Sequence, residues 1–257
     1  MGPLGEKRRI RICHLYPELM NLYGDRGNVI ALVRRAQWHG LQPVVEEVSL
    51  GTPLDPSAQD IIFIGGGQDR EQRIICKDFS RVKGESIKEA VALGVSFLAI
   101  CGGYQLLGKY YRTSAGEVLE GLGVLDAWTE AGTKRMIGNV VVESTLSGMP
   151  RTVVGFENHS GRTYLGEGAR PFGRVLSGYG NNGQDGYEGA VVGNVIGTYL
   201  HGSLLPKNPW VADWLISKAL ERRYGEPLKE GELDDSIERI AHEAAIRRAS
   251  ETARRSR

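Results

Sequence analysis

Short apolar runs alternate with segments of helical periodicity along residues 10–111. The apolar runs predict strands at residues 10–16, 43–50, 60–64 and 95–100, and the helical segments span 28–39, 86–93 and 103–111. Asn28 is expected to cap the first helix, which closes at His39 before Gly40. Strands that alternate with helices are typical of a parallel sheet covered on both faces. We therefore expect an α/β fold with a mostly parallel central sheet flanked by helices.

From about Gly121 the pattern changes to short apolar segments joined by glycine-rich turns. Strands are predicted at residues 121–129, 136–144, 152–157 and 191–200, a polar loop at 178–189, and helices at 208–222 and 237–254. No linker interrupts this half, so it is interpreted as a continuation of the same domain. The predicted organisation is a flexible N-terminus (1–8), one domain (9–222) and a charged C-terminal helix or tail (223–257).

Composition excludes several classes of protein. The chain has 257 residues, with 32 Lys and Arg against 31 Asp and Glu, so its charge does not favour nucleic acid as a partner. Three cysteines without C-x-x-C spacing predict neither disulfides nor a zinc site and favour a reducing cytoplasm. No apolar run approaches the ~20 residues of a membrane span, and residues 1–6 lack the apolar core of a signal peptide.

Cys101 is the candidate nucleophile. It follows the apolar run 95–100 directly and precedes Gly102 and Gly103 at the start of a predicted helix. Small residues after a nucleophile permit the sharp strand-to-helix turn that exposes its side chain. The positive end of the helix favours thiolate over thiol, and its free N–H groups can stabilise an oxyanion. A structural cysteine is the alternative, but it does not need glycines on its far side.

Three consecutive glycines follow the apolar run at residues 60–64. Gly65, Gly66 and Gly67 let backbone N–H groups approach a ligand closely, which fits the second half of an oxyanion hole. Gly66 and Gly102 are the expected donors, and a flexible turn is the alternative interpretation. No Gly-Lys-Ser/Thr follows, so the segment is not a phosphate-binding P-loop.

Two of the five histidines are candidate partners for the thiol, because a cysteine nucleophile needs a base or an imidazolium beside it. His201 ends the apolar run 191–200 and precedes Gly202, and His159 lies in the segment GFENHSG. Spacing alone does not separate them. The other three (His14, His39 and His242) are expected to be structural or surface residues.

Five motifs together resemble the cobyric-acid-synthase-like branch of class I glutamine amidotransferases, and within it the glutaminase subunits of lipid II isoglutaminyl synthase. They are NLYGDRGN (21–28), GGGQD (65–69), CGGYQ (101–105), GFENHSGRT (155–163) and YLHG (199–202). The resemblance covers about residues 9–220. It implies a flavodoxin-like fold and makes residues 9–222 the glutamine amidotransferase domain.

The resemblance also implies roles for single residues. Cys101 would attack the side-chain amide of L-glutamine, and His201 would serve as its base, through a γ-glutamyl thioester. Arg135 would bind the substrate, as a guanidinium can clamp an α-carboxylate; without the resemblance it reads as a surface charge. Many relatives carry Glu two positions after the histidine, where this chain has Ser203. Glu157 and Asp25 are candidates for a third catalytic member, and a Cys–His dyad is the alternative.

A glutaminase of this type implies a partner. In the resembling system a Mur-ligase-like subunit, MurT, uses ATP and Mg to activate the D-glutamate α-carboxylate of lipid II, and ammonia converts it to D-isoglutamine. We expect a cytoplasmic heterodimer at the inner face of the plasma membrane, with no cofactor or metal in this chain. The synthetase is expected to be a separate polypeptide.

Other interpretations remain open at the level of sequence. In the first interpretation the chain is still an amidotransferase subunit, but the acceptor of the ammonia is a different molecule, for example a cobyrinate-type corrinoid. The second is a cysteine hydrolase with no preference for glutamine, and the third is a non-catalytic binding module. The basic segment 246–257 carries five Arg against one Glu, which fits partner docking, attraction to anionic lipid or a solvated helix.

Overall fold

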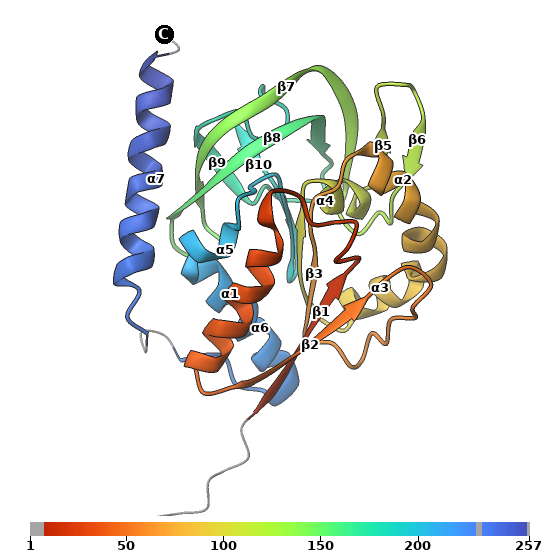
Figure 1. Ribbon diagram of the computed structural model, residues 1–257, viewed down its shortest axis with the longest axis vertical. Helices are drawn as coiled ribbons and strands as arrows, with labels where there is room; N and C mark the ends of the chain where they lie inside the picture. Colours follow the sequence, from red (N-terminus) through yellow and green to blue (C-terminus); the bar gives the residue numbers. More distant parts are fainter. Residues whose placement is uncertain (1–7, 230–232, 256–257) are drawn as a thin grey trace, which may run out of the picture.

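The computed structural model describes residues 8–229 and 233–255, so the predicted flexible N-terminus lies almost wholly outside the described residues (Figure 1). The first of two sheets, sheet A, has the strand order β11-β12-β4-β3-β1-β2, and all neighbours are parallel except β11 with β12. Its strands are β1 (Arg9–Leu15), β2 (Gln42–Val48), β3 (Ile61–Ile64), β4 (Ser96–Ile100), β11 (Ala190–Val192) and β12 (Val195–Thr198). The central strands β3 and β4 are buried at every position, as apolar runs covered on both faces should be.

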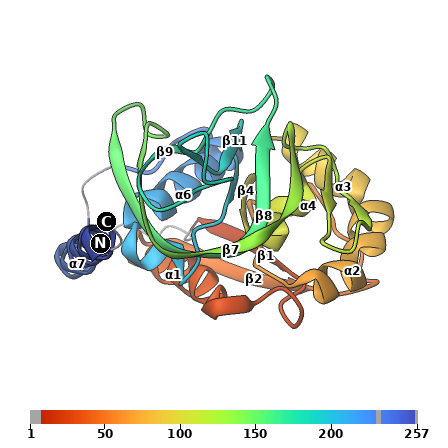
Figure 2. The ribbon, with the colours of Figure 1, turned by 90° about the horizontal axis from the view of Figure 1, so that it is seen from above.

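Helices cover both faces of sheet A, which confirms the predicted fold class (Figure 2). On one side lie α1 (Arg26–Trp38), α5 (Leu204–Lys207) and α6 (Pro209–Tyr224). On the other side lie α2 (Asp69–Lys77), α3 (Gly84–Ala92) and α4 (Gly102–Leu107), with a π-helical turn η2 (Asp78–Val82) between α2 and α3. A 3-10 turn, η1 (Leu22–Gly24), leads from β1 into α1.

The second sheet, sheet B, lies above the carboxyl ends of the strands of sheet A (Figure 1). Its order is β10-β9-β7-β5-β6, with β8 also paired to β7. The strands are β5 (Tyr110–Arg112), β6 (Val118–Glu120), β7 (Ala127–Ser144), β8 (Arg151–Leu165), β9 (Gly173–Ser177) and β10 (Tyr187–Glu188). An isolated bridge between Phe156 and His201 ties β8 to the end of β12. This bridge makes sheet B a wall of the region beyond those carboxyl ends.

Several expected boundaries are wrong, for reasons found in the tertiary contacts. The helix predicted to Tyr111 ends at Leu107, because Lys109 N–H donates to Ala127 O (2.7 Å) and the chain turns into sheet B. Of the strand predicted at 121–129, residues 121–126 form a loop bound to α4 instead. The single strand predicted at 191–200 is the hairpin of β11 and β12.

Asn28 is not a helix cap, as was expected, but lies inside α1. Its side chain is fully buried, and its Oδ1 accepts the backbone N–H of Leu205 (2.9 Å). The residue that precedes α1 is Asp25, which the site described below uses.

The predicted C-terminal helix is present as α7 (Ser236–Arg255), which runs along the side of the molecule (Figure 1). It packs on β7, β8 and α5. His242 fixes it there, because its Nδ1 donates to Lys207 O (2.8 Å) and its Nε2 pairs with Thr152 Oγ1 (2.8 Å). None of the helices in the described ranges is long and apolar enough to cross a membrane.

Candidate active site

Cys101 occupies a sharp turn between β4 and α4. Its backbone has φ 49° and ψ −102°, a region that non-glycine residues rarely adopt, so the turn is strained. The glycines after it are sterically required: a Cβ on Gly102 would lie 2.8 Å from Gly67 O, and one on Gly103 would lie 2.6 Å from Ile64 Cγ2. Cys101, a residue that is 8% exposed, lines a cavity of about 330 Å³. The geometry is that of a nucleophile elbow.

His201 follows β12 and is completely buried beside this elbow. Its backbone pairs with Phe156 of β8, with His201 N–H donating to Phe156 O (2.7 Å). Its ring nitrogen Nδ1 lies 3.4 Å from Oδ1 of Asp25, which is also fully buried. A carboxylate on Nδ1 fixes the ring and leaves Nε2 for the nucleophile.

The charges around His201 favour its imidazolium form. Burial lowers its pKa, but the negative charge of the Cys101 sulfur, hydrogen bonding to Asp25 and to Cys101, and the charge of Asp25 outweigh burial and raise the pKa to about 10. Nε2 has no fully formed hydrogen bond to any described residue, so its contact with the thiol is loose. Loose contacts between a nucleophile and its base are common before substrate binds.

Gly66 contacts the pair of His201 and Asp25 and is not among the residues that line the cavity. Its N–H donates to Oδ2 of Asp25 (2.7 Å), so it is not free for an oxyanion. A Cβ at this position would lie 2.7 Å from Cε1 of His201 and 3.2 Å from Oδ2 of Asp25. These contacts argue against the expected oxyanion role and give another reason for glycine here.

Gly67, which the sequence interpretation did not select, lines the cavity together with Cys101. Its N–H makes no hydrogen bond within the part of the chain that the structure describes. Gly102 begins α4, and the first backbone bond of that turn is Gln105 N–H to Cys101 O (2.9 Å), so the N–H of Gly102 precedes the helical ladder. Gly67 and Gly102 are therefore candidate backbone donors beside the thiol, since neither N–H has a hydrogen-bond acceptor among the described residues.

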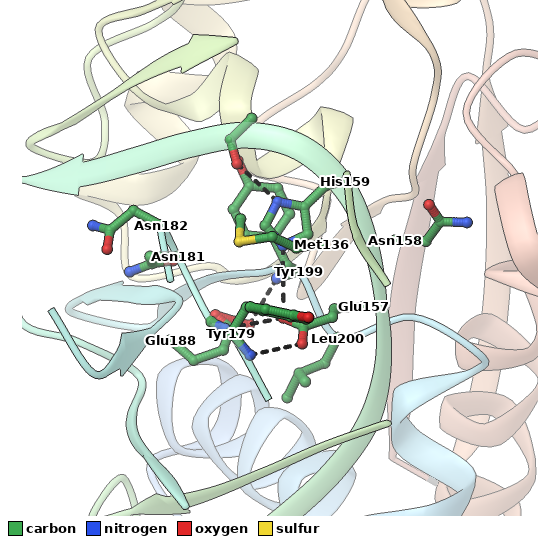
Figure 3. Close-up of polar contacts among 12 residues, drawn as sticks. Met136, Glu157, Asn158, His159, Tyr179, Asn181, Asn182, Glu188, Tyr199 and Leu200 are labelled. Carbon is green, nitrogen blue, oxygen red and sulfur yellow. Dashed lines mark hydrogen bonds and ion pairs between the residues drawn. The ribbon is translucent and has the colours of Figure 1, made fainter. Parts of the chain in front are cut away.

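Glu157, a second candidate for the third member, binds elsewhere. Its carboxylate accepts the N–H groups of Tyr179 (2.7 Å) and Gly180 (2.9 Å) and lies 3.8 Å from Nε2 of His159 (Figure 3). No contact joins it to His201 among the described residues. It therefore fixes the glycine-rich loop against β8.

His159 shares the cavity wall with Cys101 but is held differently from His201. Its Nδ1 donates to Gly161 O (2.8 Å), and its ring is stacked flat on Tyr199, with centroids 3.5 Å apart (Figure 3). Burial lowers its pKa, against the opposing effect of Glu157. Tertiary contacts thus separate the two histidines that spacing could not.

Arg135 lies on the rim of the same cavity. The pairing of β7 with β8 is irregular between Ala131 and Met136, and this bulge carries Arg135. Its Nε donates to Oδ1 of Asn158 (2.9 Å) and its Nη2 to the Asn158 carbonyl (3.2 Å). Asn158 and Tyr23 also line the cavity. Both belong to motifs that carried the resemblance, but no role was predicted for them.

Ser203, at the position where many relatives have Glu, joins the histidine segment to the loop that carries Asp25. Its Oγ donates to Gly24 O (2.7 Å), and its backbone adopts φ 50°. Gly27 must be small at this junction, because a Cβ there would lie 2.1 Å from the serine Oγ. The serine therefore binds the loop that brings the carboxylate.

A parallel α/β sheet with a cysteine elbow after one strand and a histidine after its neighbour defines the class I glutamine amidotransferase type. Residues 11–209 match the model of the CobB/CobQ-like glutamine amidotransferase domain, so the chain belongs to this family. It is 46% identical to the lipid II isoglutaminyl synthase (glutamine-hydrolyzing) subunit GatD of Staphylococcus aureus, over 94% of this chain and 96% of that protein.

The chain is also similar to a second GatD subunit, to a cobyric acid synthase and to a solved structure. Identity to the GatD subunit of Streptococcus pneumoniae is 41%, over 91% of this chain and 90% of that one. The cobyric acid synthase of Vibrio campbellii is 32% identical over 76% of this chain but only 40% of its own length. Among solved structures, PurLQS from Thermotoga maritima has a TM-score of 0.57 at 18% identity (83% of this chain, 96% of that one), and it supports the fold alone.

Proposed function

We propose that this chain is the glutamine-hydrolysing subunit of a lipid II isoglutaminyl synthase. The observation that carries the proposal is the strained Cys101 elbow, with the buried pair of His201 and Asp25 beside it. Similarity to two GatD subunits over nearly their whole lengths gives this chemistry its biological setting.

In the proposed mechanism, the Cys101 thiolate attacks the side-chain amide carbon of glutamine. The oxyanion that develops accepts hydrogen bonds from the N–H groups of Gly67 and Gly102. The His201 imidazolium protonates the departing amine, so ammonia leaves and a γ-glutamyl thioester remains. His201, now neutral, takes a proton from water, the hydroxide oxygen attacks the thioester, and glutamate and the thiolate are regenerated.

Asp25 is proposed as the third member of this group. Its Oδ1 faces Nδ1 of His201, and its Oδ2 is anchored by Gly66 N–H, so the carboxylate has one orientation. Glu157 is assigned a structural role, because its two oxygens are used by Tyr179 and Gly180. The carboxylate of this family member thus comes from the β1–α1 loop instead of the position two after the histidine.

Arg135 is proposed to bind the α-carboxylate of glutamine. The guanidinium is exposed at the rim of the cavity that Cys101 lines, and no carboxylate neutralises it in the described part of the chain. Arg135→Ala should raise KM for glutamine by about tenfold to a hundredfold, the value of a charged hydrogen-bonded contact of roughly 1.5–3 kcal/mol. Unchanged KM would remove Arg135 from the glutamine site.

The ammonia is proposed to pass to a Mur-ligase-like partner, MurT in the related system, which uses ATP and Mg to activate the D-glutamate α-carboxylate of lipid II. Both GatD relatives match this chain over at least 90% of their length, whereas the Vibrio cobyric acid synthase matches over 40% of its own. These shares favour lipid II over a corrinoid as the acceptor. The reaction would then take place at the inner face of the plasma membrane, where lipid II is made.

The primary test measures ammonia release from glutamine, with and without the co-expressed Mur-ligase-like partner. Wild type should release ammonia and form a covalent adduct with diazo-oxo-norleucine, seen as a mass shift on the Cys101 peptide. Cys101→Ala should do neither, and Cys76→Ala is the matched control that should retain both. A Cys101→Ala variant with full glutaminase activity would overturn the proposal.

A further inference from the structure

The side chain of Asn158 joins two walls of the glutamine cavity. Its Nδ2 donates to the hydroxyl of Tyr23 (2.6 Å), and its Oδ1 accepts from Nε of Arg135 (2.9 Å). All three residues line the cavity with Cys101. Figure 3 shows Asn158 on the opposite side of β8 from Glu157 and His159, as alternation along a strand requires. The amide therefore bridges the β1–α1 loop and the bulge of β7.

The Tyr23 end of this bridge reaches the catalytic histidine. The ring of Tyr23 stands edge-on to His201, with centroids 5.0 Å apart and an interplanar angle of 72°. The backbone of Tyr23 is left-handed (φ 53°), and the next residue, Gly24, is held by Ser203 Oγ. Asn158 consequently connects the histidine's neighbour to the residue proposed to bind substrate.

The amide is chemically suited to the Arg135 end. Arginine has only donors, so Oδ1 must face it and Nδ2 must face Tyr23. Asn158 uses the Nε edge of the guanidinium through Oδ1 and Nη2 through its carbonyl, without adding a charge. Nη1 makes no hydrogen bond within the described residues and remains for a carboxylate. A neutral acceptor thus fixes the guanidinium and leaves its positive charge uncompensated.

We infer that Asn158 is a positioning residue that sets the selectivity of the site for amides with an α-carboxylate. It presents Arg135 to the substrate as an oriented, uncompensated cation and holds Tyr23 against His201. This inference rests on the proposed glutaminase function, and it adds the residue through which the cavity distinguishes glutamine from simpler amides.

Asn158→Asp tests the inference, because it keeps the size of the side chain and both hydrogen bonds once the Tyr23 hydroxyl donates. The new carboxylate competes with that of glutamine for Arg135. We expect KM for glutamine to rise by at least about tenfold, with kcat within about threefold, since one charge-assisted contact is lost to substrate. The loss should be absent with 4-aminobutanamide, an analogue of glutamine without the α-carboxylate. A loss of equal size with both amides would overturn the inference.

Two further variants separate positioning from general damage. Asn194→Asp adds the same charge just before β12, at the end of that strand away from His201, where the side chain of Asn194 donates to Gly94 O (2.9 Å). In this control variant, KM for glutamine should stay at the wild-type value. In an Arg135→Ala background, Asn158→Asp should cause no additional rise in KM, because the two changes act through one contact. A further full tenfold rise would contradict a role through Arg135.

The inference and the proposed function fail in different ways. If wild type and Cys101→Ala release ammonia equally, the glutaminase assignment fails. If only wild type is active and Asn158→Asp has wild-type KM for glutamine, the assignment stands and the inference about Asn158 is wrong. Alkylation of Cys101 by iodoacetamide, which needs no α-carboxylate, should proceed equally in wild type and Asn158→Asp.

Discussion

Two buried pairs of a carboxylate and a histidine lie close to the same cysteine, and the pKa values of their histidines are shifted in opposite directions. In the first, Asp25 approaches Nδ1 of His201 at 3.4 Å, and the pKa of the imidazole is raised to about 10 despite burial. In the second, Glu157 lies 3.8 Å from Nε2 of His159, and burial lowers the pKa of that imidazole.

The difference lies in what else each group binds. His159 donates Nδ1 to Gly161 O and has one ring face covered by Tyr199, and Glu157 is occupied by two backbone N–H groups. Nε2 of neither ring has a fully formed hydrogen bond among the described residues, but Nε2 of His159 lies 3.8 Å from the Glu157 carboxylate, whereas hydrogen bonding to Cys101 helps to raise the pKa of His201. Burial and a nearby carboxylate therefore do not separate the two histidines. The neighbour of the second ring nitrogen does: it is the thiol for His201 and the Glu157 carboxylate for His159.

The largest expected effect comes from replacing each histidine in turn. His201→Asn should lower kcat for glutamine by about 10²–10⁴-fold, the usual contribution of a positioned acid–base group. His159→Asn should lower it by less than about tenfold, because its nitrogens do not face the thiol. Steady-state ammonia release measures both. A larger fall in kcat for His159→Asn than for His201→Asn would contradict the distinction between the two histidines.

Asp25→Asn should have the next largest effect. A hydrogen bond between charged groups is worth roughly 1.5–3 kcal/mol, so kcat should fall by about tenfold to a hundredfold. Glu157→Gln is the matched control and should lose less than about tenfold. Equal losses in the two variants, measured at saturating glutamine, would remove the functional distinction between the carboxylates.

The pH dependence of the stability of Asp25→Asn gives a second test of the His201–Asp25 pair. Because the pKa of His201 is raised from 6.5 to about 10, the stability that its charged form contributes is fully present below about pH 6.5 and is lost as pH rises through about 10. Urea unfolding should show the advantage of wild type over Asp25→Asn shrinking between pH 6.5 and pH 10. An advantage that grows with pH would contradict the sign of this linkage.

Glu157→Gln should affect stability more than chemistry. The substitution places an amide N–H₂ against one of the two backbone donors, Tyr179 N–H or the buried Gly180 N–H. An unsatisfied buried group costs about 1–3 kcal/mol. The urea concentration at the midpoint of unfolding should therefore fall. The KM of Glu157→Gln for glutamine, measured by ammonia release, should stay at the wild-type value. An unchanged midpoint would mean that the glycine-rich loop does not depend on this carboxylate.

The smallest expected effect is that of Ser203→Ala. The hydroxyl makes one hydrogen bond, to Gly24 O, so its loss should cost about 0.5–1.5 kcal/mol of stability. Glutaminase activity should remain within about threefold of wild type, because Asp25 has a second anchor in Gly66. A loss as large as that of Asp25→Asn would show that the serine is essential for placing the loop.

Features that depend on neighbouring residues in the sequence could be predicted, and features that depend on distant residues could not. Strands β3 and β4 and the Cys101 elbow were predicted correctly, because an apolar run and the small residues after it are local signals. The α2 helix was missed, since its nine residues (DREQRIICK) are mostly polar and only two are buried. The strands predicted at 136–144 and 152–157 are parts of β7 and β8. The full length of β7 and its antiparallel pairing with β8 were not predicted, because an irregular pairing interrupts the alternation of β7.

The sequence by itself determined the α/β sheet, the candidate nucleophile and the short list of candidate histidines and carboxylates, because these follow from side-chain type and neighbouring residues. Only the tertiary structure decided that Asp25 lies beside His201, that Gly66 N–H is already used, and that Asn158 bridges Tyr23 and Arg135. Those contacts join residues 23 to 176 positions apart, and local patterns carry no information about hydrogen bonds formed over such separations.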